Sequence, residues 1–397
     1  MTYYEPRRMR FGAFIAPYHG LNENPTLALE RDFQLVELLD RLDYDEAWVG
    51  EHHSAGFEII GSPEVFIAGA AERTRRIRLG TGVNSVTYHH PMILADRLVQ
   101  LDHQTRGRLM CGFGPGQLPS DAVMLGVDPA EQRDMMTDAL QCIVDLLDGK
   151  QVSRDASWFK LVNAQLHVLP YQSPRMDMAV ACSMTPNGPM TAGRHGLGML
   201  SLAASLGAGF DMLPNHWELY EAQSKAHGHV ASRDAWRVVV PMHLAETREA
   251  AERQVESGID ENVLTYLRGV GAPGLQDVSP KDAVRVWREQ GLLTFGRILV
   301  GTPDDAIERI RSLQAQSGGF GCFLFLALNA ADWVSTQRSY ELFARHVMPK
   351  FQNSDRRREA LEWCGTNMAK ARPRIAAGIE RAVARDPRRK AGDSTER

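Results

Sequence analysis

The chain has 397 residues, of which 44% are hydrophobic and 24% are charged, the composition of an ordinary soluble globular protein. Its formal net charge of -4 gives no general attraction to nucleic acid or to anionic lipid. The 5 cysteines are scattered without a C-x-x-C pair, which excludes a disulfide framework and a zinc ribbon. The start, MTYYEPRRMR, lacks the apolar segment of a secretion signal, and no apolar run is long enough to span a bilayer. We therefore expect a cytoplasmic protein with no membrane and no nucleic-acid partner.

Apolar, β-rich runs alternate with helical patterns along the chain. The predicted strands are residues 9–17, 47–50, 77–86, 107–114, 176–183, 197–204, 236–245 and 320–328. Most are continuous apolar runs, as expected for parallel strands covered on both faces. Helix starts are predicted at Asn24-Pro25, at Asp128-Pro129 and at Thr302-Pro303 from their capping residues and prolines. This alternation predicts an α/β fold, a (β/α)₈ (TIM) barrel; the alternative, an open doubly wound sheet, would lack a G-x-G-x-x-G after the first strand.

Two segments interrupt the alternation. Residues 155–173 are typical of a hairpin before the fifth strand, and residues 258–293, with weak periodicity and the glycines of GVGAPG, are typical of a long inserted loop. Insertions on this side of a barrel are commonly lids or binding loops. We assign residues 1–351 to the barrel and residues 352–397 to a basic C-terminal extension with one helix and a frayed end.

The segment AWVGEHHSAGFE places Glu51, His52 and His53 directly after the second predicted strand, where barrel residues face the active site. A metal site would require at least three converging ligands, and the first strand offers only His19 beyond its end. We therefore expect no metal. One of the two histidines can be a packed, hydrogen-bonded core residue, but not both.

The ends of the next three strands add polar groups and exposed backbone. After the third strand lie Gly82, Asn84, Ser85, His89 and His90, and after the fourth lie Gly112, Gly114 and Gly116. Such glycines let a ligand approach the backbone, although tight βα turns need them as well. After the fifth strand, Ser183, Met184 and Thr185 precede a helix N-terminus, which either binds an anion or is simply capped.

These strand ends carry no lysine nucleophile and no paired catalytic carboxylates, which disfavours aldolase and glycosidase chemistry. A site with few charged groups and much exposed backbone suits a cofactor that does the chemistry itself. Phe14, Val86, Tyr88, Met110 and Phe113 are expected to line an apolar substrate pocket.

From Arg8 to Phe351 the chain resembles the bacterial luciferase-like flavin-dependent monooxygenases. The resemblance is carried, in order, by RFGAFI, AWVGEHH, LGTGVNSVTYHHP, RGRLMCGFGPG, VGTPDDAIERI and FARHVMPKF. Within the family the motifs are most similar to those of enzymes acting on terpenes and alicyclic ketones, such as limonene monooxygenase and the diketocamphane monooxygenases.

The resemblance implies a barrel that takes reduced FMN (FMNH₂) from a separate flavin reductase and reacts it with O₂ to a C4a-peroxyflavin, which oxygenates a small hydrophobic substrate. It implies that His52 is the catalytic histidine, with His53 supporting it and Glu51 orienting a ring of the pair. It also implies a cis peptide at Gly82–Val83 against the flavin ring, with Asn84, His90, Gly114 and Gly116 nearby.

The resemblance further implies that Ser183, with Met184 and Thr185, binds the FMN phosphate. Three positions depart from luciferase. Pro115 replaces a phosphate-contacting arginine, Cys182 replaces a glutamate, and Gly114 stands at the reactive-cysteine position. Arg194 is therefore expected to share in binding the phosphate.

Three alternatives stay open at this point: a deazaflavin (F420)-dependent hydride-transfer enzyme of the same fold, a flavin-binding barrel without activity, and a metal-dependent hydrolase. The sequence does not decide the substrate, or whether oxygen transfer is electrophilic or nucleophilic. By analogy with the family we expect a homodimer.

Overall fold

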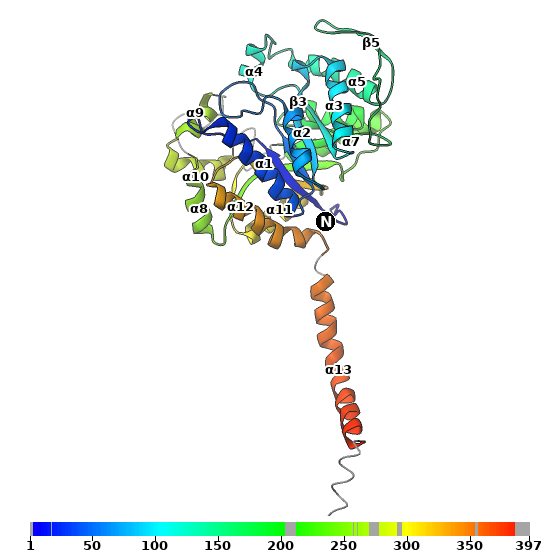
Figure 1. Ribbon diagram of the computed structural model, residues 1–397, viewed down its shortest axis with the longest axis vertical. Helices are drawn as coiled ribbons and strands as arrows, with labels where there is room; N and C mark the ends of the chain where they lie inside the picture. Colours follow the sequence, from blue (N-terminus) through cyan, green and yellow to red (C-terminus); the bar gives the residue numbers. More distant parts are fainter. Residues whose placement is uncertain are drawn as a thin grey trace, which may run out of the picture. The chain divides into compact units, whose positions relative to one another are not determined.

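The computed structural model describes residues 3–16, 18–202, 212–256, 258–259, 261–269, 278–291, 296–353 and 356–385. By its internal contacts the chain divides into two compact units, Met1–Met348 and Pro349–Arg397. The first unit carries all the strands of the described chain (Figure 1).

The first unit is a closed parallel barrel, as predicted. Its strands run in the order β9-β11-β1-β2-β3-β4-β7-β8, and β8 pairs with β9 to close the ring. Their bounds are β1 (Arg10–Ile15), β2 (Glu46–Val49), β3 (Arg78–Ser85), β4 (Leu109–Gly114), β7 (Asp177–Cys182), β8 (Gly198–Ser201), β9 (Trp236–Leu244) and β11 (Cys322–Ala327). Each corresponds to one predicted strand. A short strand that was not predicted from the sequence, β10 (Leu299–Gly301), pairs with the C-terminal end of β9.

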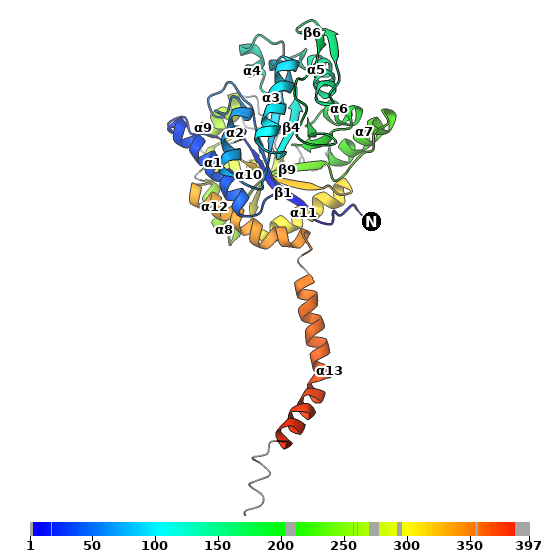
Figure 2. The ribbon, with the colours of Figure 1, turned by 45° about the vertical axis from the view of Figure 1, so that its right-hand side comes forward.

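The helices surround the barrel (Figures 1 and 2). They are α1 (Pro25–Arg41), α2 (Pro63–Arg73), α3 (Pro91–Gln104), α4 (Pro119–Met124), α5 (Gln132–Leu147), α6 (Asn187–His195), α7 (Met212–Ala226), α8 (Arg248–Glu256), α9 (Glu261–Gly269), α10 (Pro280–Gln290), α11 (Pro303–Ser317) and α12 (Trp333–Leu342). A 3-10 turn, Val86–Tyr88, follows β3, and a π turn, Phe343–Val347, follows α12.

Two of the three predicted helix starts are confirmed. The Asn24 side chain accepts a hydrogen bond from the Thr26 amide at the start of α1, and Thr302 forms a reciprocal capping box with Asp305. The third prediction was wrong. Asp128 accepts from the Ala130 amide in a separate turn, so α5 begins only at Gln132. An aspartate before a proline serves a turn as readily as a helix N-cap.

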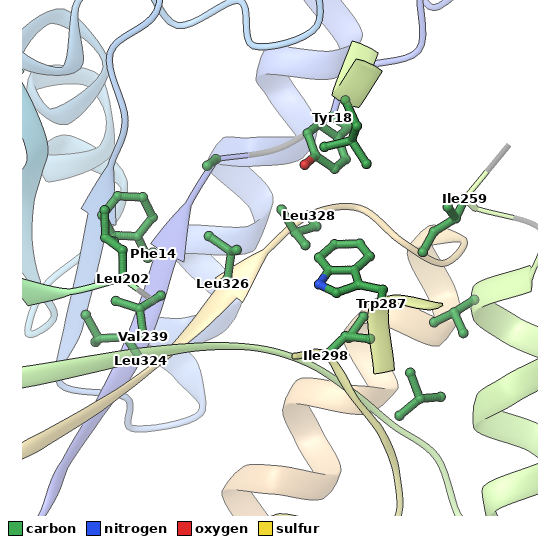
Figure 3. Packing of buried hydrophobic residues seen from close by; sticks show 14 of the residues in the cluster. Phe14, Tyr18, Leu202, Val239, Ile259, Trp287, Ile298, Leu324, Leu326 and Leu328 are labelled. Atoms are coloured by element: carbon green, nitrogen blue, oxygen red, sulfur yellow. The ribbon is translucent and has the colours of Figure 1, made fainter. Parts of the chain in front are cut away.

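The two interruptions differ in structure. Strands β5 (Val152–Asp155) and β6 (Lys160–Ala164) form an antiparallel pair between α5 and β7. The later interruption was predicted to be irregular, but its described part contains α9 and α10. Apolar residues of both helices, among them Tyr266 and Trp287, join the core cluster, which Figure 3 shows around Trp287, Ile298 and Leu328. Residues 257, 260, 270–277 and 292–295 lie outside the described part of the chain.

A charged group fills the barrel interior near the N-terminal ends of the strands. The Arg237 guanidinium, 1% exposed, binds Glu46 at 2.9 Å and Asp177 at 2.8 Å. Arg10 and the Trp48 indole N–H also donate to Glu46. Burial acts to raise the pKa of Glu46, but Arg237 and Arg10 outweigh it, so this pKa is held below its usual range.

In the second unit, the described residues form helix α13 (Arg356–Ala384), which has Pro373 in its interior and no buried residue. The predicted frayed end, residues 386–397, lies outside the described residues. In the part of the chain that the structure describes, no helix has both the length and the apolar character required to cross a membrane.

Candidate active site

A cavity of about 610 Å³ lies at the C-terminal ends of the strands. Its walls come from residues in or just after the C-terminal ends of β1, β2, β3, β4, β7 and β8 and from α5, α6 and α9. This volume is typical of a site for a cofactor or a drug-sized ligand. The cavity therefore lies where the barrel fold predicts an active site.

Glu51 is buried and binds two histidines. Its carboxylate lies 3.0 Å from His53 Nε2 and 2.7 Å from His89 Nε2, and it accepts a bond from the Ser85 amide at 2.6 Å. Burial acts to raise the pKa of Glu51, but these hydrogen bonds outweigh it, and the pKa is lowered. Glu51 therefore orients His53 and His89 as an ionised carboxylate and leaves His52 to other partners.

His52 lies between two other carboxylates. Its Nδ1 is 3.1 Å from Asp121 Oδ2, and its Nε2 is 3.6 Å from Glu58 Oε2. Burial acts to lower the pKa of His52, but Glu58 and Asp121 outweigh it, so the pKa is raised. His52 therefore carries a proton more readily than a free histidine and presents it at the cavity wall.

Asp121 is fixed by more than this one contact. It lies in α4, after β4, and also accepts bonds from the His53 amide and the Ser54 hydroxyl. The Glu58 carboxylate in turn accepts a 2.6 Å bond from the Tyr266 hydroxyl of α9. None of these three residues was predicted from the sequence. Asp121 and Tyr266 are far from the histidines in the sequence, and Glu58 follows them in a loop without periodicity.

One wall of the cavity is backbone and small side chains. The predicted cis peptide, Gly82–Val83, is present on this wall. A Cβ on Gly114 would lie 2.6 Å from Val83, and Gly116 has a φ of +92° with Tyr88 Oη 2.4 Å from the position of a Cβ. Larger residues are excluded at both positions, so the wall leaves room for a flat group.

Hydroxyl, amide and guanidinium groups form another part of the cavity lining. Ser183, Thr185 and Asn187 lie at the N-terminus of α6, and Arg194 follows in the last turn of the same helix. Arg133 of α5 joins them. Among the described residues, neither arginine has a carboxylate within salt-bridge distance. Together with the amides of the α6 N-terminus, these groups form a site suited to a phosphate.

Most of the predicted site residues line this one cavity: Glu51, His52, Gly82, Val83, Gly114, Gly116, Ser183, Met184, Thr185 and Arg194. Three others lie elsewhere. His53 binds Glu51 and is absent from the cavity lining, Asn84 is buried in β3, and His90 is exposed and packs against Phe159. Of the five residues expected to line an apolar pocket, only Phe14 does so; Val86, Met110 and Phe113 are packed in the core.

Among the described residues, no group of three or more histidine, cysteine, aspartate or glutamate side chains is arranged to hold a metal ion. The histidines and carboxylates after β2 are instead paired with one another.

The chain is similar to known proteins over most of its length. A family model described as luciferase-like monooxygenase matches residues 9–319. The chain is 44% identical over 344 residues to limonene 1,2-monooxygenase of Rhodococcus erythropolis, covering 87% of each chain. It is 42% identical to 4-hydroxyprotoasukamycin monooxygenase of Streptomyces nodosus subsp. asukaensis, covering 87% of this chain and 93% of the relative.

Among solved structures, the chain is similar to the oxygenating constituent of 3,6-diketocamphane monooxygenase from Pseudomonas putida in complex with FMN. The TM-score is 0.72 at 23% identity, and the match covers 86% of this chain and 99% of the other. At this identity the likeness supports the fold.

Proposed function

Because the chain belongs to the luciferase-like monooxygenase family, we propose that it is the oxygenase of a two-component, FMN-dependent system. Its substrate would be a small hydrophobic organic molecule, such as a terpene or a cyclic ketone, and a separate flavin reductase would supply the reduced FMN. The observation that carries this proposal is a single cavity with a phosphate-binding end, a flat backbone wall and a histidine held between carboxylates.

The residues present fit FMN at both ends. Ser183, Thr185 and the α6 amides would bind the phosphate, with Arg194 and Arg133 supplying the positive charge that Pro115 does not. The flat ring would lie against Gly82–Val83 and Gly114, where the cavity wall consists of backbone and the small side chain of Val83. When bound, reduced FMN supplies the two electrons needed to insert one oxygen atom of O₂ into the substrate and reduce the other to water.

The protein's own contribution is proton control and exclusion of water. His52, with its raised pKa, holds or releases a proton at Nε2, and Asp121 fixes the ring through Nδ1. Phe14, Leu202 and Leu267 provide apolar lining in the cavity that His52 also lines. A hydrophobic substrate bound there would displace water from the reacting groups.

The experiment that tests this function is a reductase-coupled assay with FMN, NADH and ¹⁸O₂ against terpenes, cyclic ketones and aromatic amines. We expect a product that carries one ¹⁸O atom and depends on both flavin and oxygen. Turnover without oxygen in the presence of a deazaflavin cofactor, or flavin binding without turnover of any substrate in a broad panel, would contradict the proposal.

A further inference from the structure

Glu58 is a buried carboxylate beside His52, and the proposed function gives it no role. It is 8% exposed and lines the cavity. One of its oxygens lies 3.6 Å from His52 Nε2, and the other accepts the hydroxyl of Tyr266 at 2.6 Å. Catalytic hydrogen bonds are often this long in ligand-free proteins, so proton exchange between His52 and Glu58 is within reach.

Tyr266 comes from a different part of the fold. It lies on α9, where its ring packs against Tyr18 and Phe57 with ring centroids 5.1 Å and 4.9 Å away. Burial and the neighbouring Glu58 raise the pKa of Tyr266 well above its usual range, so the hydroxyl keeps its proton and acts as a donor. The hydrogen bond that it donates fixes the position of the Glu58 carboxylate.

We propose that Glu58 is the acid–base partner of His52, and that Tyr266 is a positioning residue that holds the Glu58 carboxylate beside His52 Nε2. Without the Tyr266 hydroxyl, the Glu58 carboxylate loses the hydrogen bond that fixes its place, and it holds the proton on His52 Nε2 less firmly. The packing of α9 on the core would thus position the carboxylate that faces His52. The role of this proton in oxygenation rests on the proposed function.

Other ionisable groups face His52 and Glu58, and their effects on the His52 pKa must be distinguished from that of Glu58. Asp121 of α4 contacts His52 through the other ring nitrogen, and Glu51 acts from its place on His53 and His89. On the far side, His19 shares a small void with Glu58, but both its ring nitrogens are used, by Asp32 and by the Phe57 carbonyl.

Tyr18 also faces Glu58, and its buried hydroxyl has no hydrogen-bond partner in the described chain. Tyr18→Phe is therefore a matched control for Tyr266→Phe. Both changes remove one hydroxyl and keep a ring in the same cluster, but only one removes a bond to Glu58.

The test is an NMR titration of the histidine imidazoles in the full-length, flavin-free protein, with the His52 signal assigned by its loss in His52→Gln. An opposite charge within about 4–6 Å raises a histidine pKa by about 1 or more. We therefore expect Glu58→Gln to lower the His52 pKa by about 1. Tyr266→Phe should lower it by a smaller amount, because the carboxylate then loses its anchor and is free to turn away from His52 Nε2, and Tyr18→Phe should leave it unchanged.

The proposal is overturned if Glu58→Gln leaves the His52 pKa unchanged, if Tyr266→Phe leaves it unchanged or raises it, or if Tyr18→Phe has the same effect as Tyr266→Phe. Tyr266→Phe keeps the packing ring, so it decides the matter even if Glu58→Gln does not fold. The titration uses protein without flavin or substrate, so its result is independent of the oxygenase assay. A failed assay would not affect the titration, and a failed titration would not contradict the proposed oxygenase function.

Discussion

His52 and Asp121 follow the ends of two different strands, β2 and β4, and meet with Nδ1 3.1 Å from Oδ2. Since Asp121 is also bound by the His53 amide and the Ser54 hydroxyl, its carboxylate has little freedom to turn. The contact fixes the plane of the His52 ring and directs Nε2 toward Glu58. The neighbouring His53 is bound to Glu51 instead, so two adjacent histidines have separate environments.

This separation predicts different effects for the two histidines. His52→Ala should lower the rate of product formation by about 10²–10⁴-fold, the usual contribution of a positioned acid–base group, and should change flavin affinity little. More hydrogen peroxide should be released per turnover. His53→Ala should lower thermal stability or flavin affinity more than the chemical rate. Single-turnover kinetics with preformed reduced FMN measure the rates, and equal rates in His52→Ala and the wild type would contradict the assignment.

The pair of Asp121 and His52 also predicts a pH dependence of stability. The His52 pKa is raised in the folded state, so the stabilisation is fully present below the unfolded pKa of about 6.5 and is lost as pH rises through the folded value. The difference in unfolding free energy between the wild type and Asp121→Asn should therefore be larger at pH 6 than at pH 9. Urea titrations at both pH values measure it. A difference that grows with pH would show that His52 is neutral in the fold.

The fold was predictable from the sequence because its signals are local. Each barrel strand is an apolar run of its own, and a start such as Thr302-Pro303 carries its capping residues within one turn. The glycine wall was predictable for the same reason, since Gly82 lies in the β3 segment and Gly114 ends β4.

The partners of His52 were not predictable, because they depend on contacts between distant segments. Asp121 is 69 residues from His52, and Tyr266 is 208 residues from Glu58. Whether a side chain after a strand faces the cavity also depends on local backbone direction. For example, His90 is exposed at the N-cap of α3, whereas its neighbour His89 binds Glu51.

At the phosphate end, Arg194→Gln should weaken FMN binding. A hydrogen bond to a charged group contributes about 1.5–3 kcal/mol, which corresponds to roughly 10- to 100-fold in affinity. Riboflavin, which lacks the phosphate, serves as the control ligand and should bind the variant and the wild type alike. Fluorescence titrations with both ligands separate the two effects. An equal loss for riboflavin would place Arg194 at the ring rather than at the phosphate.

The division into two units predicts that the C-terminal extension is dispensable for the barrel. No residue of α13 is buried, so a chain ending at Asn353 should fold and melt within about 2 °C of the full-length protein. Calorimetry and FMN titration of both chains test this. A large drop in melting temperature would mean that the extension stabilises the barrel.

The charged group inside the barrel predicts a large cost for removing its arginine. Arg237→Met leaves Glu46 and Asp177 buried with fewer counter-charges, which typically costs about 3–5 kcal/mol. The pKa values of both carboxyls are lowered in the fold, so the stabilisation is present above the unfolded value of about 4 and is lost as pH falls through the folded values. The cost of Arg237→Met should therefore be full at pH 7 and smaller near pH 3.

Denaturant unfolding at the two pH values measures this cost, with the exposed Arg285→Met as a control that should change little. An equal cost at both values would mean that Arg237 acts through packing against Trp48 rather than through its charge.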